Sequence, residues 1–325
     1  MPEQGHCSRE LVLHVGFPKT ATTLLQRGLF CRDPRVVYLG KRASTERANR
    51  ASAELVRRLL WSSGECWRNP RDQLVTELSN AVESPGSGPL LISYEELTGS
   101  CFGALRVCNR FGNGRQIGVD PAALADRIGV FAREAWHGPV RVLFTVRRQD
   151  TFLASLFAQT FLWRHATHIN SFDRFLRSVC DTDFYSAGGL ALDYAWLAAE
   201  FERAIGTDAV SVLVYEDMVG DPSHFARELK DSLGIAPSTT CEALSDAGWK
   251  VRSTDRLSWQ VQRYRGNNRV RHAFQWAQRR LSGTPNPERV VLTPERSRAI
   301  LDGYADSNRR LGHRLGRSLE AYGYY

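Results

Sequence analysis

The sequence predicts an α/β fold with a central parallel sheet flanked by helices on both faces. Short apolar runs have the length of buried strands, each is followed by a turn signal, and helical patterns fill most of the chain between them. Strands that are apolar throughout are typical of a parallel sheet covered on both faces. The predicted strands are Leu11–Val15, Leu90–Ser93, Val140–Val146 and Val210–Val214.

Length and composition predict an ordinary globular protein. The 325 residues are 42% hydrophobic and 24% charged, which is enough apolar material for a core. We expect one domain over residues 1–325, with the core motifs in residues 11–240. No sequence window approaches the roughly 18 apolar residues that a membrane span needs. The seven cysteines include no C-x-x-C pair, so we expect reduced thiols, no zinc ribbon and a cytoplasmic protein.

The positive charge is concentrated late in the chain. The net charge is +8, and residues 250–280 alone contain nine Lys or Arg against one acid, Asp255. Aromatic residues lie between these charges, so we expect residues 250–325 to be a basic, aromatic-rich and helical part. Such a pattern fits nucleic acid, a pocket for an anionic small molecule, or a solvated helix face. Thr293 and Pro294 predict the start of a late helix.

The turn after the first strand has the features of an anion site. In "LVLHVGFPKTATTLLQRGLF", residues 11–30, an apolar strand leads into a helix that we expect to begin near Thr20. A helix start presents unpaired N–H groups and a positive dipole end. Gly16 lets the backbone approach a ligand, Lys19 adds a charge, and the hydroxyls of Thr22 and Thr23 can donate hydrogen bonds. We expect a phosphate or sulfate here rather than an ordinary turn.

This segment resembles the donor loop of the sulfotransferases that use 3′-phosphoadenosine-5′-phosphosulfate (PAPS). Their loop reads Gly-x-x-Lys-(Ser/Thr)-Gly-Thr-Thr, and residues 16–23 here read GFPKTATT. The chain departs from the pattern at Ala21, where glycine is usual. The resemblance implies a P-loop-like nucleotide-binding architecture of the bacterial type. It also implies that the 5′-phosphosulfate is bound by Lys19, Thr20, Ala21, Thr22 and Thr23.

A second motif follows the strand Val140–Val146. In the family, an Arg at a strand end and a Ser eight residues later hold the 3′-phosphate of the donor, and Arg147 and Ser155 have this spacing. The family's Asn-Pro is replaced by Arg148 and Gln149. We expect Arg148 to face the acceptor or solvent and Asp150 to cap the next helix.

A third motif is "VLVYEDM", residues 212–218, which resembles the Tyr-Glu-Asp strand end of the family. The resemblance places Tyr215 beside the adenine of the donor, whereas Glu216 and Asp217 are expected to hold loops. The family's late Arg-Lys-Gly clamp on the 3′-phosphate has no clear counterpart. Arg265-Gly266-Asn267 resembles this clamp only loosely.

The acceptor must lose a proton, so a general base is expected near the donor loop. Bacterial-type relatives carry Ser-x-Glu at the second strand end, and residues 93–95 here read SYE. We therefore take Glu95 as the base, with Glu96 facing away. His165 and His168 remain alternatives. His14, inside the first strand, is expected to be a satisfied core residue.

The resemblance implies transfer of a sulfuryl group from PAPS to a hydroxyl or amine of a small-molecule, lipid or carbohydrate acceptor. Lys19 would stabilise the charge of the leaving phosphate, and no metal is expected. As partners we expect PAPS and a hydroxyl-bearing acceptor, without nucleic acid or a membrane span. A P-loop kinase using ATP and magnesium is an alternative, as is a non-catalytic anion- or RNA-binding protein. A P-loop kinase would need a second glycine before Lys19 and an Asp that holds the metal ion, and the sequence has neither.

Overall fold

The fold class predicted from the sequence is confirmed. A computed structural model describes residues 9–41, 45–68, 73–80, 88–102, 119–164, 171–180, 187–235, 257–261 and 289–325. Within these residues, five parallel strands form a sheet with the order β2-β3-β1-β4-β5. The strands are β1 (Leu11–His14), β2 (Val37–Tyr38), β3 (Leu90–Ser93), β4 (Val140–Val146) and β5 (Val210–Val214).

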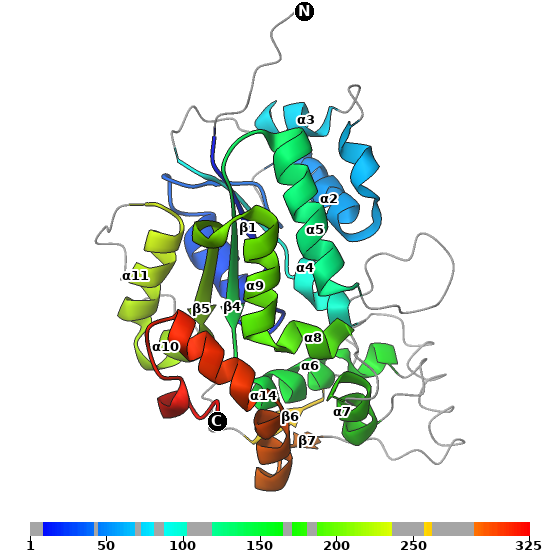
Figure 1. The fold of residues 1–325 in the computed structure, drawn as a ribbon, viewed down its shortest axis with the longest axis vertical. Helices are drawn as coiled ribbons and strands as arrows, with labels where there is room; N and C mark the ends of the chain where they lie inside the picture. Colours follow the sequence, from blue (N-terminus) through cyan, green and yellow to red (C-terminus); the bar gives the residue numbers. More distant parts are fainter. Residues whose placement is uncertain are drawn as a thin grey trace, which may run out of the picture.

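Helices cover both faces of this sheet (Figure 1). The α-helices are α1 (Thr22–Leu24), α2 (Glu46–Trp61), α3 (Leu74–Asn80), α4 (Glu96–Gly99), α5 (Pro121–Phe131), α6 (Gln149–Arg164), α7 (Phe172–Cys180), α8 (Ala187–Leu192), α9 (Tyr194–Ile205), α10 (Tyr215–Gly220), α11 (Pro222–Ser232) and α14 (Pro294–Arg314). Two π-helical segments, η1 (Leu25–Phe30) and η4 (Ala132–Trp136), continue α1 and α5. The 3₁₀ turns are η2 (Gly64–Arg68), η3 (Ser100–Phe102), η6 (Thr207–Ala209) and η8 (Glu320–Tyr322).

Alternate residues of β1 divide the core in two. Leu11 and Leu13 belong to the larger cluster, to which α5, α6 and α9 contribute, whereas Val12 packs with side chains of η1 and α11. All three side chains are fully buried. The sheet is therefore apolar on both faces, as the uninterrupted hydrophobic runs predict.

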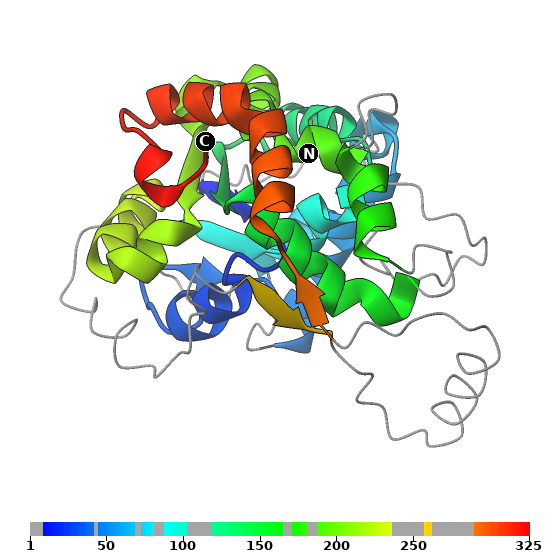
Figure 2. The same cartoon turned by 90° about the horizontal axis from the view of Figure 1, so that it is seen from below.

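The strand order places β1 at the centre, between β3 and β4. In register, His14 lies beside Ser93 of β3 and Leu143 of β4, so the carboxyl ends of the three strands meet at one edge. The chain fills the sheet on one side of β1 before it crosses to β4, which makes a topological switch point. Figure 2 looks onto the edge formed by these carboxyl ends. Ligands of open α/β sheets bind at the carboxyl edge, at a topological switch point.

The late part of the chain contains strands that the sequence analysis did not predict. β6 (Ser258–Gln260) pairs antiparallel with β7 (Arg289–Val291), and Trp259 and Val290 are buried. The predicted start of α14 is confirmed, because the Thr293 side chain accepts a hydrogen bond from the N–H of Arg296 and proline follows it. Most of the basic stretch 250–280 lies outside the described residues. Within the described ranges, no helix has the length and apolarity of a membrane span.

Candidate functional site

The loop between β1 and α1 adopts a conformation that L-residues rarely take. Lys19 has φ 69° and Ala21 has φ 62°, both in the left-handed region. Thr20 and Thr22 donate hydrogen bonds from their hydroxyls to the carbonyl of Phe17, at 2.6 and 3.1 Å. We expected the helix to begin near Thr20, but it begins at Thr22 because left-handed Ala21 occupies the N-cap position. The loop is thus folded back on itself around one carbonyl.

The loop residues named from the sequence differ in exposure. Thr20 and Thr22 are buried, Lys19 and Ala21 are half-buried, and Thr23 is exposed. Because both buried hydroxyls donate to Phe17, they shape the loop in this structure. Among the polar side chains of the loop, Lys19 and Thr23 keep solvent-exposed surface.

Gly16 is required for a reason that the sequence did not reveal. A Cβ there would lie 2.7 Å from Nε2 of His14, whereas the expected approach of a ligand to this backbone stays a prediction. The imidazole fills that space, with its Nδ1 2.7 Å from Oγ of Ser93. Gln26, in η1, donates from its amide to the Oγ and carbonyl of Ser93, at 3.1 and 3.2 Å. These contacts join the loop between β1 and α1, the helix after it and the end of β3.

His14 is less satisfied than expected. It is fully buried, and its Nε2 has no hydrogen-bond partner among the described residues. Burial lowers the pKa of His14 to about 4, because a charged imidazole would lose its hydration there. The ring is therefore neutral at physiological pH and acts as a rigid support under Gly16.

The end of β3 carries the predicted base. Glu95 precedes α4 and keeps about a quarter of its side chain exposed, with Oε1 3.8 Å from Nζ of Lys41. Lys41 also pairs with Glu96. Thr98, one turn further along, donates from its hydroxyl to the carbonyls of Val15 and Gly16, at 2.8 and 3.0 Å. The segment with Glu95 is thus attached directly to the start of the loop between β1 and α1.

Arg147 links all three sequence motifs. Its Nη1 donates to the carbonyl of Lys19 at 3.0 Å, and its guanidinium lies 4.6 Å from the ring centre of Tyr215. Nε donates to the hydroxyl of Thr151 in the first turn of α6. Only 5% of Arg147 is exposed. A fixed, mostly buried guanidinium beside an aromatic ring and an anion loop is suited to a phosphate group.

The residues after Arg147 differ from what the sequence analysis expected. Arg148 faces neither an open acceptor side nor solvent, because its Nε is paired with Asp150 at 2.8 Å and its side chain is mostly buried. Asp150 lies inside the first turn of α6, where it also accepts a hydrogen bond from Ser297. Ser155, 4% exposed, lies in α6 two turns beyond Arg147. Phe152 and Phe157 of this helix are fully buried core residues.

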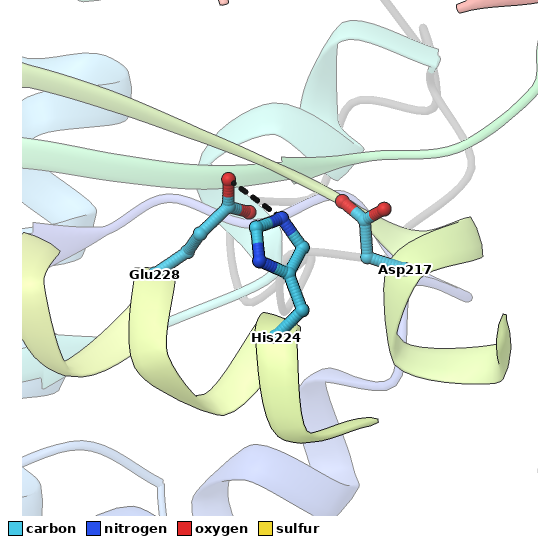
Figure 3. A group of neighbouring side chains, drawn as sticks. All are labelled: Asp217, His224 and Glu228. Atoms are coloured by element: carbon cyan, nitrogen blue, oxygen red, sulfur yellow. Dashed lines mark ion pairs between the residues drawn. The ribbon is translucent and has the colours of Figure 1, made fainter. Parts of the chain in front are cut away.

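Three possible metal ligands come together beside this site, namely Asp217, His224 and Glu228 (Figure 3). The guanidinium of Arg317 lies among them, with Nη1 3.1 Å from Asp217 and 3.2 Å from Nε2 of His224. Its Nη2 is 3.5 Å from Glu228. The positive charge that a metal ion would bring is therefore supplied by an arginine. The geometry favours an ion-pair network that attaches the chain after α14 to α10 and α11.

Some predicted residues cannot be placed. His165, His168 and Arg265-Gly266-Asn267 lie outside the described residues. The sequence analysis missed Gln26 and Ser93 as partners, and it missed Tyr194, whose hydroxyl donates to the carbonyl of Arg147 at 2.6 Å. A polar residue within an apolar strand or helix face was the signal available for Ser93 and Gln26.

Comparison with solved structures finds two sulfotransferases whose structures are similar to that of this chain. It is similar to a sulfotransferase from Alicyclobacillus acidocaldarius, at 13% identity and a TM-score of 0.47, over 97% of this chain and 98% of that one. It is also similar to the sulfotransferase domain of the Synechococcus PCC 7002 olefin synthase, at 13% identity and a TM-score of 0.40, over 75% and 78% of the two chains. No protein-family model and no curated protein matches the sequence significantly.

Proposed function

We propose that this protein is a PAPS-dependent sulfotransferase, which moves a sulfuryl group to a hydroxyl or amine of a small-molecule, lipid or carbohydrate acceptor. The observation that carries the proposal is the position of Arg147, which is hydrogen-bonded to Lys19 and lies against Tyr215. These three residues come from three strand ends that are far apart in sequence. A donor with phosphate groups at two positions of one nucleoside needs such a divided site.

Each motif then has a part of the donor to bind. The loop around Lys19 takes the 5′-phosphosulfate, and Arg147 with Ser155 takes the 3′-phosphate. Tyr215 is 4% exposed and lies against Arg147, which suits contact with the edge of the adenine. A guanidinium held by protein contacts loses little freedom when the phosphate binds, which favours affinity.

The reaction needs one proton acceptor and one stabilised leaving group. The acceptor oxygen or nitrogen attacks sulfur while the bond between sulfur and the bridging phosphate oxygen breaks. The acceptor's proton passes to the carboxylate of Glu95, and the bridging electrons stay on the 5′-phosphate. Lys19 stabilises that added charge. The exposed quarter of Glu95 and the attachment of α4 to the donor loop through Thr98 suit this role.

Calorimetric titration with 3′-phosphoadenosine-5′-phosphate, beside ATP with magnesium, tests the donor. We expect micromolar binding of the bisphosphate and none of ATP. Arg147→Ala should weaken that binding by about a hundredfold, because a charge-assisted contact to phosphate is lost. Arg133→Ala is a matched control, since Arg133 lies in η4 and its guanidinium bonds the carbonyl of Ala204. An absence of bisphosphate binding by the wild-type protein would refute the proposal, and tight ATP binding would indicate a kinase.

A further inference from the structure

A closed ring of buried hydrogen bonds surrounds the turn that presents Arg147. The ring begins at Glu216, whose Oε1 accepts from the backbone N–H of Arg148 at 3.2 Å. Its Oε2 accepts from the hydroxyl of Tyr324 at 2.8 Å. The carbonyl of Tyr324 accepts from Asn308 of α14 at 2.9 Å, and Asn308 exchanges two side-chain hydrogen bonds with Gln149, at 2.7 and 3.2 Å.

This ring is almost completely shielded from water. Gln149, Asn308 and Tyr324 have no exposed surface, and Glu216 is 4% exposed. Polar groups at this depth are costly when they are unpaired and rigid when every partner is in place. Burial raises the pKa of Glu216, against the opposing effects of the hydrogen bonds from Tyr324 and Arg148 and the charge of Arg147. The charged form of the Glu216 carboxyl group is therefore stabilised by these hydrogen bonds and by the charge of Arg147.

The segment after α14, residues 315–325, supplies further contacts to the same place. The carbonyl of Tyr322 accepts from Nη1 of Arg148 at 3.4 Å, and its hydroxyl donates to Asp217 at 2.5 Å. Arg317 pairs with Asp217 as well. Figure 1 shows this segment, in red, returning beside α10. Residues from the late part of the chain thus hold both the turn after β4 and the start of α10.

We propose that this late part of the chain completes the donor site, with Glu216 and Tyr324 as positioning residues for Arg147. The inference rests on the proposed function, because it assigns the ring to binding of the donor's 3′-phosphate. Arg148 and Gln149 are the two residues that follow Arg147, so a shift of their backbone changes the direction of its guanidinium. Tyr215 precedes Glu216 directly, so the ring also fixes the aromatic surface against which Arg147 lies.

The test is calorimetric titration of the full chain with 3′-phosphoadenosine-5′-phosphate, for wild type, Tyr324→Phe, Glu216→Ala and Glu216→Gln. We expect Tyr324→Phe to weaken binding about three- to tenfold, since one hydrogen bond to a charged group is removed. Glu216→Ala should weaken it at least tenfold. Glu216→Gln should stay within about threefold of wild type, because its amide oxygen still accepts from Arg148. Tyr324→Phe should add less than twofold when Glu216→Ala is already present.

Tyr325→Phe is the matched control, because its hydroxyl bonds Ser318 in an exposed contact and not the ring. It should bind like wild type. Thermal melting of each variant shows that the titration is made on folded protein. A lowered melting temperature with unchanged bisphosphate affinity in both Tyr324→Phe and Glu216→Ala would overturn the inference and leave the proposed function standing. Failure of the wild-type protein to bind the bisphosphate would overturn both.

Discussion

Replacement of Gly16 by alanine tests how the loop between β1 and α1 is supported. The added Cβ would lie 2.7 Å from Nε2 and 2.9 Å from Cε1 of His14, about 0.7–1 Å closer than an unstrained contact. The ring cannot easily give way, since Nδ1 is bonded to Ser93 and the ring packs edge-on against Phe30. The loop is also held, because Thr98 bonds the carbonyl of Gly16. We therefore expect a loss of about 1–3 kcal/mol in the free energy of unfolding, the usual effect of overpacking.

Urea denaturation of the variant, followed by circular dichroism, measures this loss. In a His14→Ala background the space is open, so Gly16→Ala should then cost less than about 0.5 kcal/mol. Gly303→Ala is the matched control, because the same substitution there should raise rather than lower the free energy of unfolding. Gly303 lies inside α14 with nothing near its missing Cβ, so the change should stabilise the protein by about 0.5–1 kcal/mol. An equal cost of Gly16→Ala in both backgrounds would refute the steric explanation.

Three further predictions concern the same edge of the sheet. Glu95→Gln should lower kcat at least about a hundredfold with bisphosphate affinity unchanged, in a sulfuryl-transfer assay with calorimetry, because the base is lost but the donor site is intact. Stability should fall by up to about 3 kcal/mol between pH 6.5 and 4, because the unfolded state protonates His14 and the folded state, with a pKa of about 4, does not. His14→Gln should flatten that slope in urea melts. Ala21→Gly should stabilise the protein by up to about 1 kcal/mol, because φ is 62° there, whereas Ala53→Gly inside α2 should cost about 1 kcal/mol.

The sheet was predictable because its central strands are continuous apolar runs. Three predicted strands agree with β3, β4 and β5 at both ends, and the first extends one residue beyond β1. β2 was not predicted, although Val37 and Tyr38 lie inside the short apolar run 36–39. The strand itself has two residues, both half-buried at the sheet edge. β6 and β7 lie in the part that we expected to be helical. Their three-residue length gives too short a pattern to compete with the basic, aromatic composition around them.

The convergence of Lys19, Arg147 and Tyr215 was predictable for a related reason. Arg147 and Tyr215 directly follow β4 and β5, Lys19 lies in the loop after β1, and the carboxyl ends of parallel strands share one edge. The partners of Arg148 and Glu216 could not be predicted, because Tyr322 and Tyr324 lie more than a hundred residues away and no local pattern connects them. Sequence order thus indicates which residues reach the site, but the contacts that aim them depend on distant packing.

The carbonyl groups of the loop between β1 and α1 are bound by hydrogen-bond donors of the protein itself. Thr98 binds the carbonyl of Gly16, Thr20 binds that of Phe17, and Arg147 binds that of Lys19. Because a trans peptide unit is planar, its N–H points away from its carbonyl. The N–H groups of Phe17 and Thr20 are therefore turned away from these buried donors. In this loop, with left-handed residues at positions 19 and 21, the negative ends of these peptide dipoles are thus bound by the protein itself. We therefore expect the backbone of the loop to favour an anion before any side chain contributes charge.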